Sequence, residues 1–184
     1  MSEPINPADM DLLLLPVALE LLNCLCTALN QQTNPPEICC LRAGDSVTAD
    51  IGQYYDECCS GLAYVRPAGF YMTGTQEGPF PSPSTDQAIN ACGVPAWGLQ
   101  LEMGVLRCIQ TSGQISCATW TDAVVQQLAD AKAMRAAVCC LEQLHDPSDV
   151  ALGAWTPIGP AGGCLGSVWQ VSVQVSNVCE VECG

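Results

Sequence analysis

The chain has 184 residues, of which 49% are hydrophobic and 13% charged. This composition excludes a disordered protein and suits one folded domain over residues 1–184. The 19 acidic residues outnumber the five basic ones, for a net charge of −14, and such a surface disfavours direct binding to nucleic acid or to an anionic membrane.

The first element expected is a helix over residues 15–30. Apolar side chains recur every three or four residues along it, at Leu15, Leu19, Leu22, Cys26 and Leu29. This spacing is typical of an amphipathic helix. The apolar run has an acidic flank and is interrupted by Pro16 and Glu20, so we expect no export signal and no membrane span. We therefore expect synthesis in a reducing cytoplasm, where disulfides are rare.

Strands are expected next, over residues 38–43, 47–51, 58–66 and 97–109. Alternation is clearest in the last of these, with Leu99, Leu101, Met103 and Val105 on one face and Gln100 and Glu102 on the other. Residues 67–97 are rich in Pro, Gly, Ser and Thr and show no period. Such a stretch predicts a long contact loop.

A second helix is expected over residues 121–144, with Thr121 as its N-cap and Asp146-Pro147 after its end. Its apolar stripe would be Val124, Leu128, Ala131, Met134, Val138 and Leu141. A hairpin over residues 152–176 follows, with Trp169, Val171, Val173 and Val175 on one face of its second strand. The order of elements predicts an α+β domain, a mostly antiparallel sheet packed by two main helices.

The 14 cysteines include three adjacent pairs, Cys39-Cys40, Cys58-Cys59 and Cys139-Cys140. The sequence has no CxxC spacing and one histidine, His145, and adjacent residues of a strand point to opposite faces. We therefore expect no metal and no cofactor.

The sequence also shows little sign of a catalytic motif. His145 precedes Asp146 at a helix end, where we interpret it as interacting with the helix dipole and free carbonyls rather than as a base. The sequence contains no phosphate-binding loop, nucleophile elbow or paired-carboxylate motif. We expect no catalytic residues and no enzyme activity.

Two sets of residues are interpreted as structural. The tryptophans Trp97, Trp120, Trp155 and Trp169 suit core or subunit anchors. The cysteines suit a packing or disulfide framework, in which the two members of each doublet serve two environments. The candidates are Cys39, Cys40, Cys58, Cys59, Cys92, Cys108, Cys139, Cys140, Cys164, Cys179 and Cys183.

Four segments carry a resemblance to a known family: "CCSGLAYVRP", "LEMGVLRC", "LADAKAMRAAVCC" and "WTPIGPAGGCLGSVWQVSVQV". From about residue 55 on, the chain resembles the tail terminators, a group of head-to-tail connector proteins from long-tailed (siphovirus) phages of actinobacteria. The resemblance implies a small α+β subunit that forms a hexameric ring on the tail tube, ends tube polymerisation and joins the tail to the head connector, or stopper, protein. Genomic DNA would pass through the lumen without specific binding, and the family has no catalytic residues.

The resemblance also implies where the protein functions, at the head–tail interface of the virion, after synthesis in the host cytoplasm. The cysteine load departs from the family. For the cysteines we expect some thiols to be paired in mature particles and none in new subunits. Two alternatives stay open. One is another connector ring, a stopper or an adaptor, and the other is a disulfide-rich secreted binding protein.

Overall fold

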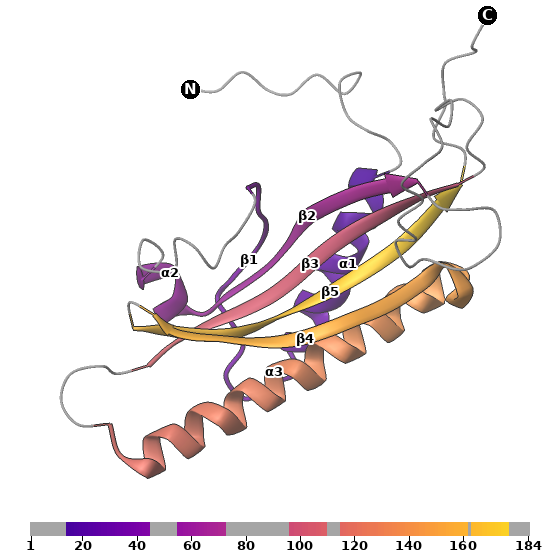
Figure 1. The fold of residues 1–184 in the computed structure, drawn as a ribbon. Helices are drawn as coiled ribbons and strands as arrows, with labels where there is room; N and C mark the ends of the chain where they lie inside the picture. The colour runs from indigo at the N-terminus through magenta and orange to yellow at the C-terminus, as the bar shows by residue number, and fades with distance from the viewer. Residues whose placement is uncertain (1–13, 45–54, 73–95, 110–114, 162, 177–184) are drawn as a thin grey trace, which may run out of the picture.

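A computed structural model of the protein describes residues 14–44, 55–72, 96–109, 115–161 and 163–176. It shows an α+β fold, in which a five-stranded sheet carries two long helices on one face and a short helix on the other (Figure 1). The elements are α1 (Leu14–Leu29), β1 (Ile38–Leu41), α2 (Tyr55–Ser60), β2 (Leu62–Met72), β3 (Ala96–Cys108), α3 (Cys117–Leu144), a 3-10 turn η4 (Pro147–Asp149), β4 (Val150–Ala161) and β5 (Cys164–Ser176). None of these helices is both long and apolar enough to cross a membrane, within the described ranges.

The strands follow the order β1-β2-β3-β5-β4. β1 runs parallel to β2, and every other neighbouring pair is antiparallel. The predicted fold class, a mostly antiparallel sheet packed by two main helices, is therefore confirmed. The parallel β1 is an addition that the sequence pattern did not reveal.

The main core lies between the sheet and the two long helices. Leu99, Leu101, Met103 and Val105 of β3 all face it, as their alternation predicts. The face that α1 turns inward differs from the predicted stripe. It contains Val17, Ala18, Leu21, Cys24, Leu25 and Leu29, whereas Leu19 is exposed. Almost every residue of this helix is apolar, so spacing alone did not identify the buried side.

A second, smaller cluster lies on the opposite face of the sheet, beneath α2. Its buried members are Cys58, Leu62, Tyr64, Leu106, Cys164 and Val168. The predicted strand over residues 58–66 is wrong at its start, because Cys58 and Cys59 belong to α2 and β2 begins at Leu62. Gly61 makes the change of direction with a φ of 78°, a backbone conformation that favours glycine. A Cβ there would also meet the Pro36 Cα at 2.8 Å.

The predicted contact loop over residues 67–97 is shorter than expected. β2 continues to Met72 through an irregularity between Pro67 and Gly69, and β3 begins at Ala96. Proline is tolerated at such a bulge because the ladder hydrogen bond is already interrupted. The remainder, 73–95, and the predicted strand over 47–51 lie outside the described residues.

The second long helix begins earlier than predicted. α3 starts at Cys117, with Ser116 as its N-cap in place of Thr121, because the Ser116 hydroxyl accepts the Thr119 N–H at 3.1 Å. Its buried side chains begin only at Asp130, so Val124 and Leu128 of the predicted stripe are exposed. The predicted terminal hairpin is present, with β4 starting two residues earlier, at Val150.

Candidate functional site

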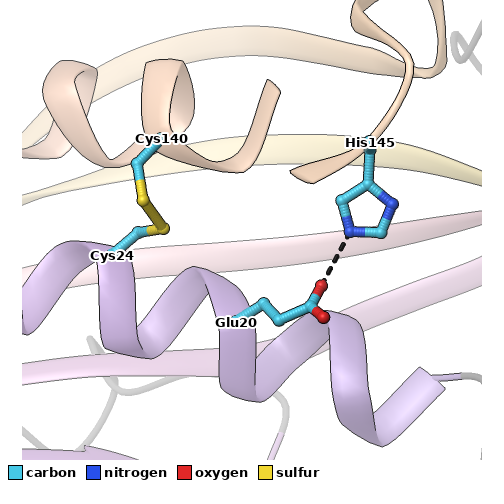
Figure 2. Close-up of a disulfide and its surroundings, with 4 residues drawn as sticks. All are labelled: Glu20, Cys24, Cys140 and His145. Atoms are coloured by element: carbon cyan, nitrogen blue, oxygen red, sulfur yellow. Dashed lines mark hydrogen bonds and ion pairs between the residues drawn. A yellow bond between two sulfur atoms is a disulfide. The ribbon is translucent and has the colours of Figure 1, made fainter. Parts of the chain in front are cut away.

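In the described part of the chain, four disulfides connect the helices to other elements. They are Cys24–Cys140 (α1 to α3), Cys26–Cys39 (α1 to β1), Cys58–Cys164 (α2 to β5) and Cys59–Cys108 (α2 to β3), with Cα–Cα distances of 5.9, 6.2, 6.0 and 4.3 Å. Figure 2 shows the first of these between the two long helices. Both layers of helices are therefore covalently attached to the sheet or to each other.

Two of the three cysteine doublets serve two environments, as expected. Cys39 bonds to α1, while Cys40 remains free and packs against the cluster on the other face of the sheet. Cys140 bonds to α1, while Cys139 is free and exposed. In both cases one doublet member is a cross-link and the other is a thiol.

The doublet Cys58-Cys59 behaves differently, because it lies in a helix and not in a strand. Both of its members are bonded, to Cys164 on β5 and Cys108 on β3. Adjacent residues of a helix diverge by about 100°, and β3 and β5 are neighbours in the sheet. Both side chains therefore reach the strands beneath α2.

Three cysteines outside the candidate set are also placed by the structure. Cys24 and Cys26 form disulfides, and Cys117 is a free, exposed thiol at the start of α3. The Cys24-x-Cys26 spacing puts the two thiols on different sides of α1. The sequence therefore contained a signal that these two cysteines bond to different partners. The candidates Cys92, Cys179 and Cys183 lie outside the described residues.

A buried ion pair joins the sheet to α3. The Arg107 guanidinium donates to both carboxylate oxygens of Asp130, at 3.0 and 2.8 Å, and to the Asn34 carbonyl at 2.8 Å. Asp130 is 1% exposed and also accepts from Gln126 at 3.2 Å. Because each charge is enclosed and paired, removing either one would leave the other buried without compensation.

A second buried pair lies on the opposite face of the sheet. Arg66 donates to the two oxygens of Glu102 at 2.8 and 3.0 Å, and the Tyr64 hydroxyl donates to the same carboxylate at 3.0 Å. Burial, and then the neighbouring Glu102 carboxylate, raise the pKa of Tyr64 well above its ordinary value. This group therefore positions strands and is unsuited to proton transfer near neutral pH.

His145 contacts a partner that the sequence did not indicate. Its Nε2 lies 2.8 Å from a carboxylate oxygen of Glu20 on α1 (Figure 2). The expected contact of its side chain with free helix carbonyls is absent, and only its backbone N–H bonds to a helix carbonyl, that of Leu141. The contact joins the same two helices as the Cys24–Cys140 disulfide.

The tryptophans divide between packing and exposure. Trp97 stacks on Phe70 with ring centroids 4.7 Å apart, and Trp155 lies opposite Trp169 across the β4–β5 pair. Trp120 is 39% exposed on α3. Three of the four are therefore in contact within the fold, and one is available at the surface.

Most of the large hydrophobic side chains that are exposed among the described residues lie on α3. Its N-terminal half exposes Trp120, Val124, Val125 and Leu128 at 39, 49, 61 and 57%. The free Cys117 and Cys139 and the exposed Lys132 and Arg135 lie on the same helix. We call the side that carries Cys117, Val124, Leu128, Arg135 and Cys139 the outer face of α3.

The described surface has one cleft of moderate size. A cleft of about 400 Å³ between the end of α1 and α3 is lined mainly by alanine and by neutral polar residues such as Gln32, Asn34 and Gln126. Within the described segments, no group of three or more His, Cys, Asp or Glu side chains is placed to hold a metal ion.

No known protein family matches the sequence, and no curated protein matches it.

Proposed function

We propose that this protein is a tail terminator of a long-tailed bacteriophage. Six copies form a ring that caps the tail tube, ends its polymerisation and binds the head connector, while DNA passes through the lumen. The protein is made in the host cytoplasm and functions at the head–tail interface of the virion. It acts as a structural subunit without catalysis.

The edge of β4 is the observation that carries the proposal. Within the described residues this 12-residue strand pairs on one side only, with β5, and it contains no charged residue. Edge strands that must stay unpaired usually carry charges, prolines or bulges, or are short. β4 carries Pro157 and Pro160, and its pairing with β5 is irregular between Leu152 and Trp155 and between Ile158 and Ala161. A neighbouring subunit can therefore add to this edge by main-chain hydrogen bonds along its regular stretches.

Charge supports the passage of DNA. The chain carries −14, and two of its five basic residues, Arg66 and Arg107, are consumed in buried ion pairs. Each pair also removes one acidic residue, Glu102 or Asp130, so the remaining residues still carry the full net charge of −14. A lumen with this character repels the phosphate backbone and prevents adhesion.

The test is the mass and location of the assembled protein. Six subunits of 19.4 kDa give a ring of about 116 kDa, which we expect by native mass spectrometry and at the upper end of tails by cryo-electron microscopy. Ala154→Lys on β4 should prevent the ring, whereas Ala43→Lys, an exposed control with the same charge change, should not. A stable monomer that never joins tails would refute the proposal.

A stopper ring is the alternative within the same class, and the position of the ring relative to the tail tube distinguishes the two. The four disulfides favour one candidate of a different class, a secreted binding protein. That candidate predicts a monomer in the culture medium of uninfected cells.

A further inference from the structure

The four disulfides of the described residues differ in their exposure to solvent. Cys59 and Cys108 are both exposed. The neighbouring bond, Cys58–Cys164, has both of its residues at 0% exposure, and the remaining two bonds join residues that are buried or half-buried. A thiolate breaks a disulfide only by direct attack on one of its sulfurs, so access controls the rate. Cys59–Cys108 is therefore the bond that an external thiol reaches first.

A small hollow leads to this bond. It has a volume of about 200 Å³ and lies where α2, the end of β3 and the segment between α1 and β1 meet. Cys59 and Cys108 line it together with Pro35, Glu37 and Gly61. Ligand pockets usually have about 300 to 1,000 Å³, so this hollow suits a thiol with only a few non-hydrogen atoms.

The charge around the hollow favours one class of thiol. Arg107 also lines the hollow, but its guanidinium is paired with Asp130. The exposed Glu37 adds a carboxylate, on a chain whose net charge is −14. A thiol that carries an amine is therefore attracted to this place, and a thiol that carries a carboxylate is repelled.

We propose that Cys59–Cys108 is a thiol-exchange site, which small amine-bearing thiols open while the other three disulfides stay closed. The thiolate of the small thiol attacks one sulfur, the Cys59–Cys108 S–S bond breaks, and its electron pair leaves on the other sulfur, which takes up the proton that the small thiol released. A second small thiol attacks the mixed disulfide in the same way. Two small thiols are thereby oxidised to one disulfide, and Cys59 and Cys108 are reduced to two thiols.

The structure explains why α2 stays in place when this bond opens. Cys58 remains bonded to Cys164 within the buried cluster beneath the helix. The chain that follows α2 is also attached to β1, because the Ile38 N–H donates to the Gly61 carbonyl at 3.0 Å. Once Cys59 is reduced, its doublet has one cross-linked member and one thiol, as the other two doublets already have.

Differential labelling tests the site on the isolated chain, and it is separate from the test of the ring. The free thiols of the native protein are blocked with N-ethylmaleimide, cysteamine is added, and the thiols that it releases are labelled with deuterated N-ethylmaleimide. Fragmentation mass spectrometry assigns each label to a cysteine. Cys59 and Cys108 should acquire the heavy label at least about tenfold faster than the six cysteines of the other disulfides.

The adjacent Cys58 is the internal control, since it lies in the same helix. Heavy label on Cys58 at the rate of Cys59 would overturn the proposal. Label that appears only as the helical circular dichroism signal is lost would do the same, because the bond would then open by unfolding. The double variant Cys59→Ser with Cys108→Ser should acquire no heavy label over the same period, and labelling of its other cysteines at the wild-type rate would also count against the site.

Two further variants test the class of thiol. The rate with cysteamine is divided by the rate with mercaptopropionate, which carries a carboxylate, so that differences between the two reagents cancel when variants are compared. This ratio should fall about two- to fivefold in Glu37→Gln. It should stay unchanged in Glu142→Gln, because Glu142 lies about 24 Å along α3 from Gln126, which lines the hollow. Equal ratios in the wild type and Glu37→Gln would overturn the preference for amine-bearing thiols.

Discussion

Asp130→Asn should destabilise the protein more than any surface change on the same helix. The substitution keeps the shape of the side chain but removes the charge that Arg107 contacts twice, at 3.0 and 2.8 Å. Arg107 is 7% exposed and Asp130 is 1% exposed, so water cannot replace the lost partner. Breaking a buried pair from one side costs about 3 to 5 kcal/mol.

Thermal unfolding followed by circular dichroism measures the effect. In a domain of this size each kcal/mol lowers the midpoint by about 2 to 4 °C, so the expected decrease is about 6 to 20 °C. Asp122→Asn is the matched control, because it makes the same change at an exposed position of α3 and should change stability by less than about 0.5 kcal/mol.

A double variant separates an uncompensated charge from lost packing. Arg107→Met with Asp130→Leu removes both charges together and should be less destabilising than Asp130→Asn alone, since no buried charge is left without a partner. If Asp130→Asn unfolds at the temperature of the wild type, the reasoning about an enclosed ion pair is refuted. A double variant that is worse than the single one would show that packing, and not charge, dominates at this site.

Three further outcomes are expected. The pKa of Tyr64 is raised in the folded protein. Its neutral hydroxyl therefore contributes fully to stability below about pH 10, the pKa of tyrosine in an unfolded chain, and this contribution declines as the pH rises further. The decrease in the urea midpoint between pH 9 and pH 10.5 should be smaller for Tyr64→Phe than for the wild type. Replacing the Cys24–Cys140 pair by alanines should cost about 1 kcal/mol more than replacing Cys26–Cys39. With the other disulfides intact, the shortest path between Cys24 and Cys140 runs through Cys26–Cys39 and Cys58–Cys164 and has about 45 residues, against 13 residues for Cys26–Cys39, and these loops correspond to about 4.0 and 2.9 kcal/mol. Equal midpoints in urea would contradict this ranking. Elemental analysis of purified protein should show no stoichiometric zinc, and one zinc per chain would overturn the assignment of the cysteines to cross-links and packing.

The parts of the fold that follow from local pattern were predictable. Alternation from Leu99 to Val105 identified the inner face of β3, and Asp146-Pro147 located the end of α3. The start of α3 was missed because Ser116 and Thr121 are both good N-caps, and only the hydrogen bond to the Thr119 N–H distinguishes them.

Features that depend on distant partners were not predictable. Arg66 and Tyr64 alternate with Ala63 and Val65, a pattern that predicts a strand with one exposed face. Both faces are buried, because Glu102 and the cluster under α2 cover the side that carries Arg66 and Tyr64. The cysteine doublets indicated a framework, but connectivity requires the sheet order, which brings β3 and β5 together beneath α2.

The arrangement of the disulfides has a consequence for a chain that has been cut. Any single break in the backbone between residues 24 and 164 is spanned by at least one disulfide, and a break between residues 59 and 108 is spanned by three, namely Cys24–Cys140, Cys58–Cys164 and Cys59–Cys108. A protease that cleaves once in this region therefore leaves two pieces of one molecule, which separate only when a reductant is added.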